Sequence, residues 1–277
     1  MVNSHYPLVR HNYMRTVTAI MLLTFSFYKS FGLTAYTVQT DSVKEKIQLI
    51  NTWVQCLDTL SPFQDGDWKL IDSLNTQVEK VLFEVLNDKN IVKYKIDTLI
   101  HLNVTKSADN KVFIFSFYEN TGGSYKSNVN IIHYRLSNGQ PKAKGLNFCE
   151  GEVQGGDDYG GTIDKIIILK ANNKTKYLAL GGGVGCSTCE FDDAFLFNID
   201  TNDLQTDFCL HVDFRQGDGE LKYNPKDKTL SYNYTIYSDD SIYGTDCLDG
   251  QKIEDNKCKY RGQYKFNGDT FVEVTKK

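Results

Sequence analysis

The chain has 277 residues, of which 24% are charged and 40% hydrophobic, and its formal net charge is −4. Acidic and basic residues are interspersed along the sequence. This argues against nucleic acid or an anionic membrane surface as a partner, because phosphate binding needs clustered Lys and Arg. The 17 Tyr and 16 Phe, with only 4 Pro, favour strands over disorder.

Residues 1–35 are predicted to be a leader. Within them, Met14–Ala35 has one arginine near its start, an apolar run over Thr16–Tyr28 and small residues at its end, which is the layout of a secretory signal peptide. The run of about 13 residues is shorter than the roughly 20 that cross a bilayer. We therefore expect export to the periplasm or the cell exterior, with no membrane span in the mature chain. Residues 1–13 are either an over-called start or a long polar n-region.

Residues 36–90 are predicted to form a helical hairpin. Apolar residues at three- and four-residue spacing over 43–60 predict one amphipathic helix, which ends before Pro62. Asp67 is a candidate N-cap for the second helix. The predicted apolar face of that helix comprises Trp68, Ile71, Leu74, Val78, Val81, Leu82 and Val85. Cys56 lies on the apolar face of the first helix and is expected to be a buried free thiol.

Residues 91–277 are predicted to form an antiparallel β domain. The hydrophobic period changes from 3.6 to 2, and the first alternating segment is Ile96–Val104. Further strand-like segments follow, several of them joined by short turns of hairpin type, such as 172–174 and 267–269. Sequential hairpins place antiparallel strands side by side. The fold class expected is therefore α+β, with the helical hairpin packed on a large antiparallel β-meander that forms a sandwich or a partly closed barrel.

The chain contains seven cysteines, and an oxidising compartment favours pairing of some of them. Cys247 and Cys258 flank a polar loop between strand-like segments. A disulfide between these two is the preferred pairing, because it would constrain the loop in the unfolded chain.

A Gly-rich segment, 181–189, carries Cys186 and Cys189 and is predicted to be a loop. A redox Cys-x-x-Cys needs its first thiol at a helix N-terminus, whereas a strand-like segment follows here. A structural disulfide, either within this pair or to Cys149 or Cys209, is preferred to redox activity.

A zinc site is the alternative for these cysteines. Cys186 and Cys189, followed by Cys209 and His211, have the residue types of a tetrahedral site, and Cys209 and His211 share one face of a predicted strand. Against this, a strand-borne Cys-x-His lacks the geometry of a zinc ribbon, and exported thiols are usually oxidised. We therefore expect no metal or cofactor. The strand histidines, such as His133, are expected at the surface.

Two longer irregular stretches, 139–162 and 238–259, could hold binding groups on loops. The best acidic candidates lie in the first of them: Glu150, Glu152, Asp157 and Asp158. Their spacing does not match a calcium-binding loop. A carboxylate pair among them could serve a glycoside hydrolase, although most acids of this kind are turn formers that face water.

Four strand-and-turn segments in the C-terminal half are similar to those of a type of uncharacterised exported protein from Gram-negative bacteria. These segments are 176–185, 194–200, 221–232 and 264–271. The resemblance implies a signal peptide and a β-rich fold. It implies no activity and no site residue.

The sequence shows no catalytic constellation, but aromatic residues recur in its strands and loops. Examples are Tyr118, Tyr125, Tyr159, Tyr237 and Tyr243. Such side chains suit recognition of a protein or glycan surface. We therefore expect a non-catalytic binding or surface-interaction protein. The alternatives are an exported hydrolase that uses the loop carboxylates and a thiol–disulfide protein that uses the Cys-x-x-Cys pair.

Overall fold

A computed structural model of the chain describes residues 42–64, 66–94, 99–122, 127–146, 160–172, 174–187, 189–215, 219–237, 251–254 and 257–274. The expected leader, 1–35, and the acidic candidates Glu150, Glu152, Asp157 and Asp158 lie outside these residues. So do Cys149, Cys247 and the side chains of Cys186 and Cys189. The expectations that concern them stay predictions.

The predicted helical hairpin is confirmed. It consists of α2 (Val43–Leu57) and α3 (Asp67–Asn87), and a short 3-10 helix, η1 (Lys89–Lys93), follows. The side chain of Ser42 caps α2 by accepting the N–H of Glu45 at 3.1 Å. Asp67 is the first residue of α3, whereas Gly66, at φ 90°, is its N-cap. The prediction that Asp67 is the cap is therefore wrong by one residue, because the backbone needs a left-handed conformation there, which glycine adopts most easily.

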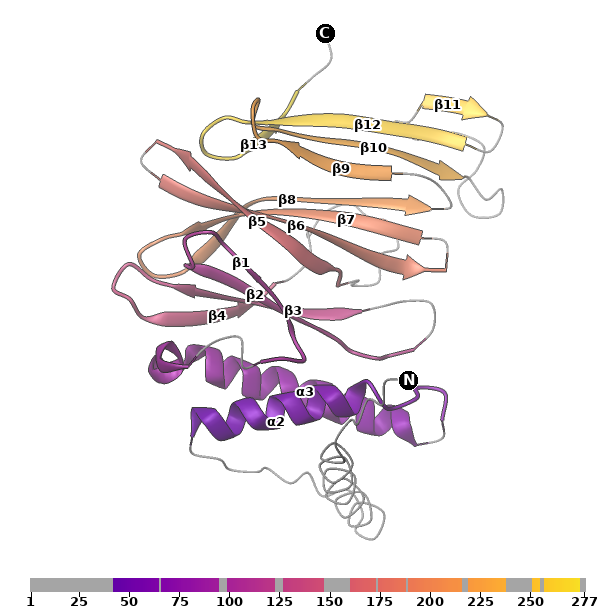
Figure 1. Cartoon of the computed structure of the whole chain (residues 1–277). Coiled ribbons are helices and arrows are strands. Elements are labelled where there is room, and N and C mark those ends of the chain that lie inside the picture. The colour runs from indigo at the N-terminus through magenta and orange to yellow at the C-terminus, as the bar shows by residue number, and fades with distance from the viewer. Residues whose placement is uncertain are drawn as a thin grey trace, which may run out of the picture. The chain divides into compact units, whose positions relative to one another are not determined.

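The strands form three antiparallel sheets, which we call A, B and C (Figure 1). Sheet A contains β1 (Asn103–Lys106), β2 (Val112–Tyr118), β3 (Asn128–Arg135) and β4 (Pro141–Gly145), in that order. Sheet B contains β5 (Thr162–Ala171), β6 (Lys174–Cys186), β7 (Cys189–Ile199) and β8 (Leu204–Arg215), also in chain order.

Sheet C contains β9 (Gly219–Asn224), β10 (Thr229–Tyr237), β11 (Gln251–Glu254), β12 (Lys257–Phe266) and β13 (Phe271–Glu273). Its order is β11-β12-β10-β9, and β13 also pairs with β12. The α+β class and the antiparallel β-meander are thus confirmed. As far as the described strands go, the sheets stay open and do not close into a barrel.

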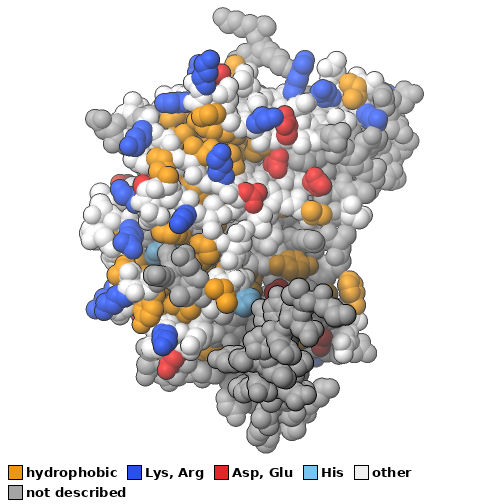
Figure 2. All heavy atoms as spheres, viewed as in Figure 1, with side chains coloured by type: hydrophobic (Ala, Val, Ile, Leu, Met, Phe, Trp, Pro, Cys, Tyr) orange, Lys and Arg blue, Asp and Glu red, His pale blue; other side chains and the backbone are white. Residues whose placement is uncertain are grey.

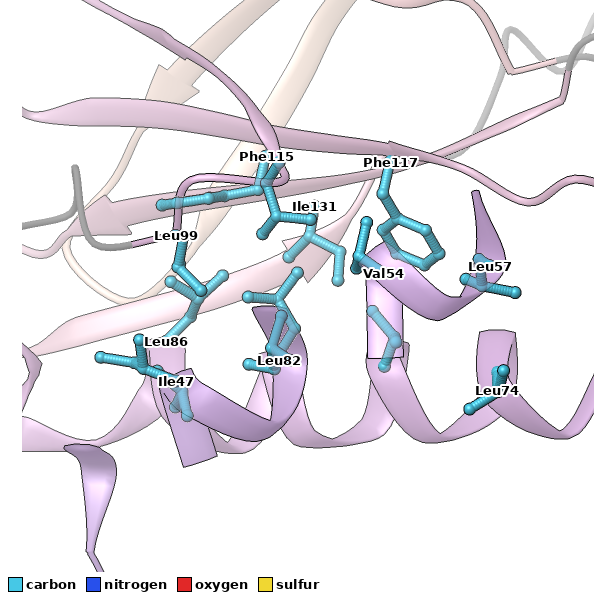
Figure 3. Close-up of a cluster of buried hydrophobic side chains, with 14 of the residues drawn as sticks. Ile47, Val54, Leu57, Leu74, Leu82, Leu86, Leu99, Phe115, Phe117 and Ile131 are labelled. Atoms are coloured by element: carbon cyan, nitrogen blue, oxygen red, sulfur yellow. The ribbon is translucent and has the colours of Figure 1, made fainter. Parts of the chain in front are cut away.

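Three hydrophobic cores separate four layers of structure. The helices cover one face of sheet A, where Ile47, Val54 and Leu82 point toward Phe115, Phe117 and Ile131 (Figure 3). A second core lies between sheets A and B and includes Ile132, Tyr134, Phe195 and Phe197. A third core lies between sheets B and C and includes Leu196, Leu230 and Phe266. The neighbours Ile131 and Ile132 therefore enter different cores, as the alternation along a strand requires.

The structure corrects several expectations about individual segments. Residues 99–102 form a turn, so that the strand expected over Ile96–Val104 begins only at Asn103. The stretches expected to be irregular contain β4, β11 and the start of β12. His133, expected at the surface, is 1% exposed. It faces the helices from β3, because it shares the face of Ile131.

Residues 181–186 of the Gly-rich segment belong to strand β6 and not to a loop. A Cβ added at Gly181 would lie 2.0 Å from the carbonyl oxygen of Thr162, and one added at Gly183 would lie 2.7 Å from the ring of Phe191. These glycines therefore let β5 and a buried ring approach the backbone closely.

Among the helices that the structure describes, none combines the length and the apolarity needed to cross a membrane.

Candidate functional site

A groove of about 430 Å³ lies between one face of α3 and the segment that joins β2 to β3. Cavities of small-molecule sites typically measure about 300–1,000 Å³. The groove is lined by Pro62 from the loop between the helices, by Trp68, Ile71, Asp72, Asn75, Thr76 and Glu79 from α3, and by Glu119, Asn120, Thr121 and Val129 from sheet A.

The α3 residues form one stripe along the helix, because they follow each other at three- and four-residue intervals. Ile71 is 3% exposed and belongs to the core between the helices and sheet A. Asp72, Thr76 and Glu79 are exposed on the same stripe. The same helix therefore supplies a buried apolar side chain at the bottom of the groove and exposed polar side chains along its side.

Asn120 fixes the opposite wall of the groove to the end of α2. Its side-chain Nδ2 donates to the carbonyl oxygen of Leu57 at 2.7 Å and to that of Leu60 at 2.8 Å. Leu57 is the last residue of α2, where carbonyls lack partners within the helix, and Leu60 lies in the loop that follows. Asn120 has φ 53°, a left-handed conformation that asparagine tolerates better than most residues.

Asn75 leaves an acceptor unsatisfied at the groove. Its Nδ2 donates to the carbonyl oxygen of Glu119 at 2.8 Å, which fixes the orientation of the amide. Its Oδ1 is buried and has no hydrogen-bond partner in the structure. Leaving a buried acceptor unpaired costs about 1–3 kcal/mol, so a ligand that donates a hydrogen bond here would recover that free energy.

Glu119 is held by the start of the next strand. Its N–H donates to the carbonyl oxygen of Ser127 at 3.0 Å, and its carboxylate accepts a short hydrogen bond from the Ser127 hydroxyl. Together with Asp72 and Glu79 it supplies three carboxylates to the lining. None of the lining residues described is basic. The groove is therefore rich in hydrogen-bond acceptors and negative in charge.

Two strongly exposed aromatic side chains lie beside the groove. Trp68 is 58% exposed and Phe63 is 81% exposed, and they are the only aromatic residues among the exposed large hydrophobic residues of the described chain. The Nζ of Lys69 lies 5.4 Å from the centre of the Trp68 ring, so the ammonium group of the neighbouring residue already lies over one face of the ring. Trp68 has the helical spacing predicted for the apolar face and lies on one stripe with Ile71, but its exposure keeps it out of the core.

Cys209 and His211 do share one face of β8, as the strand period predicts, but they form no metal centre. Cys209 is disulfide-bonded, which removes it as a thiolate ligand. The Nδ1 of His211 lies 2.7 Å from Oδ1 of Asp193, directly opposite on β7. Burial raises the pKa of Asp193, against the lowering effect of the His211 contact. We interpret this pair as a structural contact that satisfies a buried carboxylate.

Metal-binding clusters of three or more His, Cys, Asp or Glu side chains do not occur within the part of the chain that the structure describes. Cys258 is also disulfide-bonded, whereas Cys56 is free and half-buried, with its pKa raised mainly by burial. Cys209 packs against the core between sheets A and B, and Cys258 lies on sheet C. The Cys247–Cys258 pairing stays a prediction, because Cys247 lies outside the described residues.

The tyrosines expected to mediate recognition do not form the groove. Tyr118 is half-buried at the end of β2, and the side chains of Tyr125, Tyr159, Tyr237 and Tyr243 lie outside the described part. Sequence reasoning missed the stripe of α3 because it counted Trp68 as core. The available signal was the set of polar residues at helical spacing from Trp68, namely Asp72, Asn75 and Glu79.

Comparison of the chain with protein-family models, with curated proteins and with solved structures finds no match in any of the three.

Proposed function

We propose that this is an exported, non-catalytic binding protein, and that the groove beside Trp68 holds a glycan. The observation that carries the proposal is that both strongly exposed aromatic residues of the described chain flank a groove lined by carboxylates and amides. This combination suits a ligand with apolar C–H faces and many hydroxyl groups. An aromatic ring packs against the former, and acceptor oxygens bind the latter.

The charge of the groove narrows the ligand class. Asp72, Glu79 and Glu119 would repel an anionic sugar, whereas the hydroxyl groups of a neutral sugar or the ammonium of an amino sugar can donate to them. The unpaired Oδ1 of Asn75 is a further acceptor for such a group. We therefore propose a neutral or amine-bearing glycan.

Export is supported by the signal-like layout of residues 1–35 and by the disulfide state of Cys209 and Cys258. Disulfides persist mainly in oxidising compartments. Mass spectrometry of the protein recovered from its native host tests this part. We expect an N-terminus within about ten residues after Gly32 and oxidised cysteines. An intact leader with fully reduced cysteines would overturn export.

Binding is tested with the purified chain from residue 36 onward, by calorimetry and on an array of neutral, amine-bearing and acidic oligosaccharides. We expect neutral or amine-bearing members to bind, and Trp68→Ala to weaken binding tenfold or more. Asn75→Leu should also weaken it, because this variant loses the acceptor. Ile100→Ala is the control, since Ile100 is 72% exposed but does not line the groove. A preference for acidic sugars, or equal binding by Trp68→Ala and Ile100→Ala, would reject the groove as the site.

A further inference from the structure

The outer face of sheet C carries a row of basic side chains. Along β12, Cys258 and Phe266 are buried, and Tyr264 packs into the core between sheets B and C. The odd-numbered residues of β12, which alternate with these, therefore point away from the core. On this outward side lie Lys257, Lys259, Arg261, Gln263 and Lys265. Four of these five outward residues are basic, in a chain whose net charge is −4.

The neighbouring strands extend the row into a polar surface. Lys259 is paired with Thr235 of β10 and Arg261 with Asn233, while Ser231 faces Lys222 of β9. Lys222 forms an exposed ion pair with Glu220 at 2.9 Å. Figure 2, viewed as Figure 1, shows several Lys and Arg side chains at the end of the molecule where β9, β10 and β12 lie, with others spread down one side. We call Lys222, Lys259, Arg261 and Lys265 the basic face.

The spacing of this row suits a polymer. Alternate residues of a strand lie roughly 6.5–7 Å apart, so Lys259, Arg261 and Lys265 present cations along a straight line of roughly 20 Å. Hydroxyl and amide groups on β10 lie beside that line, one strand spacing or about 4.8 Å away. A linear ligand with repeated negative charges and hydroxyl groups matches this arrangement in both charge and hydrogen bonding.

The position of the aromatic residues distinguishes between two kinds of polyanion. Binding of single-stranded nucleic acid relies on stacking of bases against aromatic side chains. On sheet C, Tyr232, Tyr234, Tyr260 and Tyr264 contact one another on the inner face. None of the outward side chains described on β9, β10 and β12 is aromatic. We propose that the basic face binds an anionic polysaccharide that carries sulfate or carboxylate groups.

This inference does not depend on the groove. The groove lies on α3 and the β2–β3 segment and selects against anions, whereas the basic face lies on sheet C and requires them. The cations of β12 do not form a basic cluster in the sequence, because tyrosine, glycine and cysteine lie between them. Folding places those intervening residues on the other side of the sheet.

The test uses the purified chain from residue 36 onward and four probes at 50 mM NaCl: heparin, polygalacturonate, a single-stranded DNA and neutral dextran. We expect heparin or polygalacturonate to bind, dextran not to bind, and binding to weaken at least tenfold at 500 mM NaCl, because exposed charges are screened. Lys259→Gln/Arg261→Gln/Lys265→Gln should weaken polyanion binding at least tenfold. Lys44→Gln/Lys80→Gln/Lys89→Gln removes the same charge from the helical layer and should change it less than twofold.

Three outcomes would overturn the proposal. They are no binding of either acidic polysaccharide at 50 mM NaCl, an equal loss in the two triple variants, and tighter binding of the DNA than of heparin at equal charge. If the triple variant of β12 unfolds, the single charge reversal Arg261→Glu replaces it, with Lys80→Glu as its control. Trp68→Ala should bind heparin as the unaltered protein does, so that failure of the groove proposal and failure of this one are distinguishable.

Discussion

The Nζ of Lys176 lies 2.7 Å from Oδ1 of Asp269, and this contact joins sheet B to the β12–β13 turn of sheet C. The same Nζ lies 3.0 Å from Oδ2 of Asp207 on β8. The Lys176 side chain is only 2% exposed. Burial by itself lowers the pKa of Lys176, but the hydrogen bonds to Asp269 and Asp207 outweigh it, so the pKa is raised. The lysine therefore stays charged inside the interface between two layers.

Replacing Lys176 should loosen that interface. Lys176→Met keeps the length of the side chain and removes both hydrogen bonds, and we expect a loss of about 1–3 kcal/mol in the free energy of unfolding in urea. The loss is moderate because the two carboxylates left behind can be solvated: Asp207 is 20% exposed and Asp269 is 70% exposed.

Lys222→Met is the matched control for Lys176→Met. It removes an ion pair whose partners are 69% and 59% exposed, and pairs of this kind contribute about 0–1 kcal/mol. If both variants cost the same free energy, the contact between Lys176 and Asp269 has no special role between the sheets.

The buried His133 predicts a loss of stability in mild acid. Burial, assisted by the charge of Arg135, lowers its pKa from an ordinary value near 6.5 to about 4. Between these two pH values His133 is protonated in the unfolded chain but stays neutral in the folded chain. The free energy of unfolding therefore has its full value above about pH 6.5. It falls by about 3 kcal/mol as the pH drops toward 4, and His133 causes no further loss below that pH.

The variant His133→Leu should flatten this dependence. Urea unfolding measured from pH 8 to pH 4.5 gives the slope for each protein. The difference at pH 8 reports packing and the lost backbone hydrogen bonds with Leu86 and Lys142, because histidine is neutral there in both states. If the free energy of unfolding falls equally between pH 6.5 and 4.5 with and without His133, the loss of stability in acid is not caused by the lowered pKa of this residue.

The helices and the hairpins could be predicted from sequence because both are encoded locally. The 3.6 period gave α2 and α3, and turn residues such as Asn172 and Gly268 do have positive φ, at 50° and 104°. Neither pattern says which layer meets which face. Ile131 and Ile132 are equally apolar, yet one packs on the helices and the other on sheet B.

The candidate site escaped sequence reasoning because its opposite walls come together only in the folded chain. Trp68 fits the apolar period of α3 but is 58% exposed in the folded chain. Asn120, which carries the opposite wall, is more than 50 residues away in sequence from the Leu57 and Leu60 carbonyls that hold it. Such contacts depend on how the layers meet, and no local pattern contains that information.

Asn120 therefore gives a test of how the groove is held. Asn120→Ala loses both hydrogen bonds to the end of α2. It also requires alanine to adopt the left-handed conformation at φ 53°, which asparagine tolerates better. We expect a loss of about 2–3 kcal/mol in the free energy of unfolding. Asn120→Gly loses the same bonds but accepts the backbone conformation, so it should cost about 1 kcal/mol less. Equal losses in urea unfolding would mean that the left-handed conformation carries no strain.

Gly262 and Tyr232 should be energetically coupled, because they are paired across β12 and β10 and the ring covers the glycine. A Cβ at Gly262 would lie 2.4 Å from Cζ of Tyr232, whose ring also contacts those of Tyr234 and Tyr264 at centroid distances of 5.7 Å and 6.3 Å. The ring cannot move away without losing these contacts. Gly262→Ala should therefore destabilise the protein by about 1–2 kcal/mol.

The same substitution should change sign when the ring is absent. In a Tyr232→Ala background, Gly262→Ala meets no clash and restricts the unfolded chain, so it should be neutral or stabilise by up to about 1 kcal/mol. A double-mutant cycle in urea at pH 8 should thus give a coupling free energy of at least about 1 kcal/mol. Additive effects within about 0.3 kcal/mol would show that the ring does not rest on Gly262 in solution. Coupling of the expected size would establish that a glycine in the middle of β12 is what allows the tyrosines to fill the inner face of sheet C, leaving the cations of that strand on the outer face.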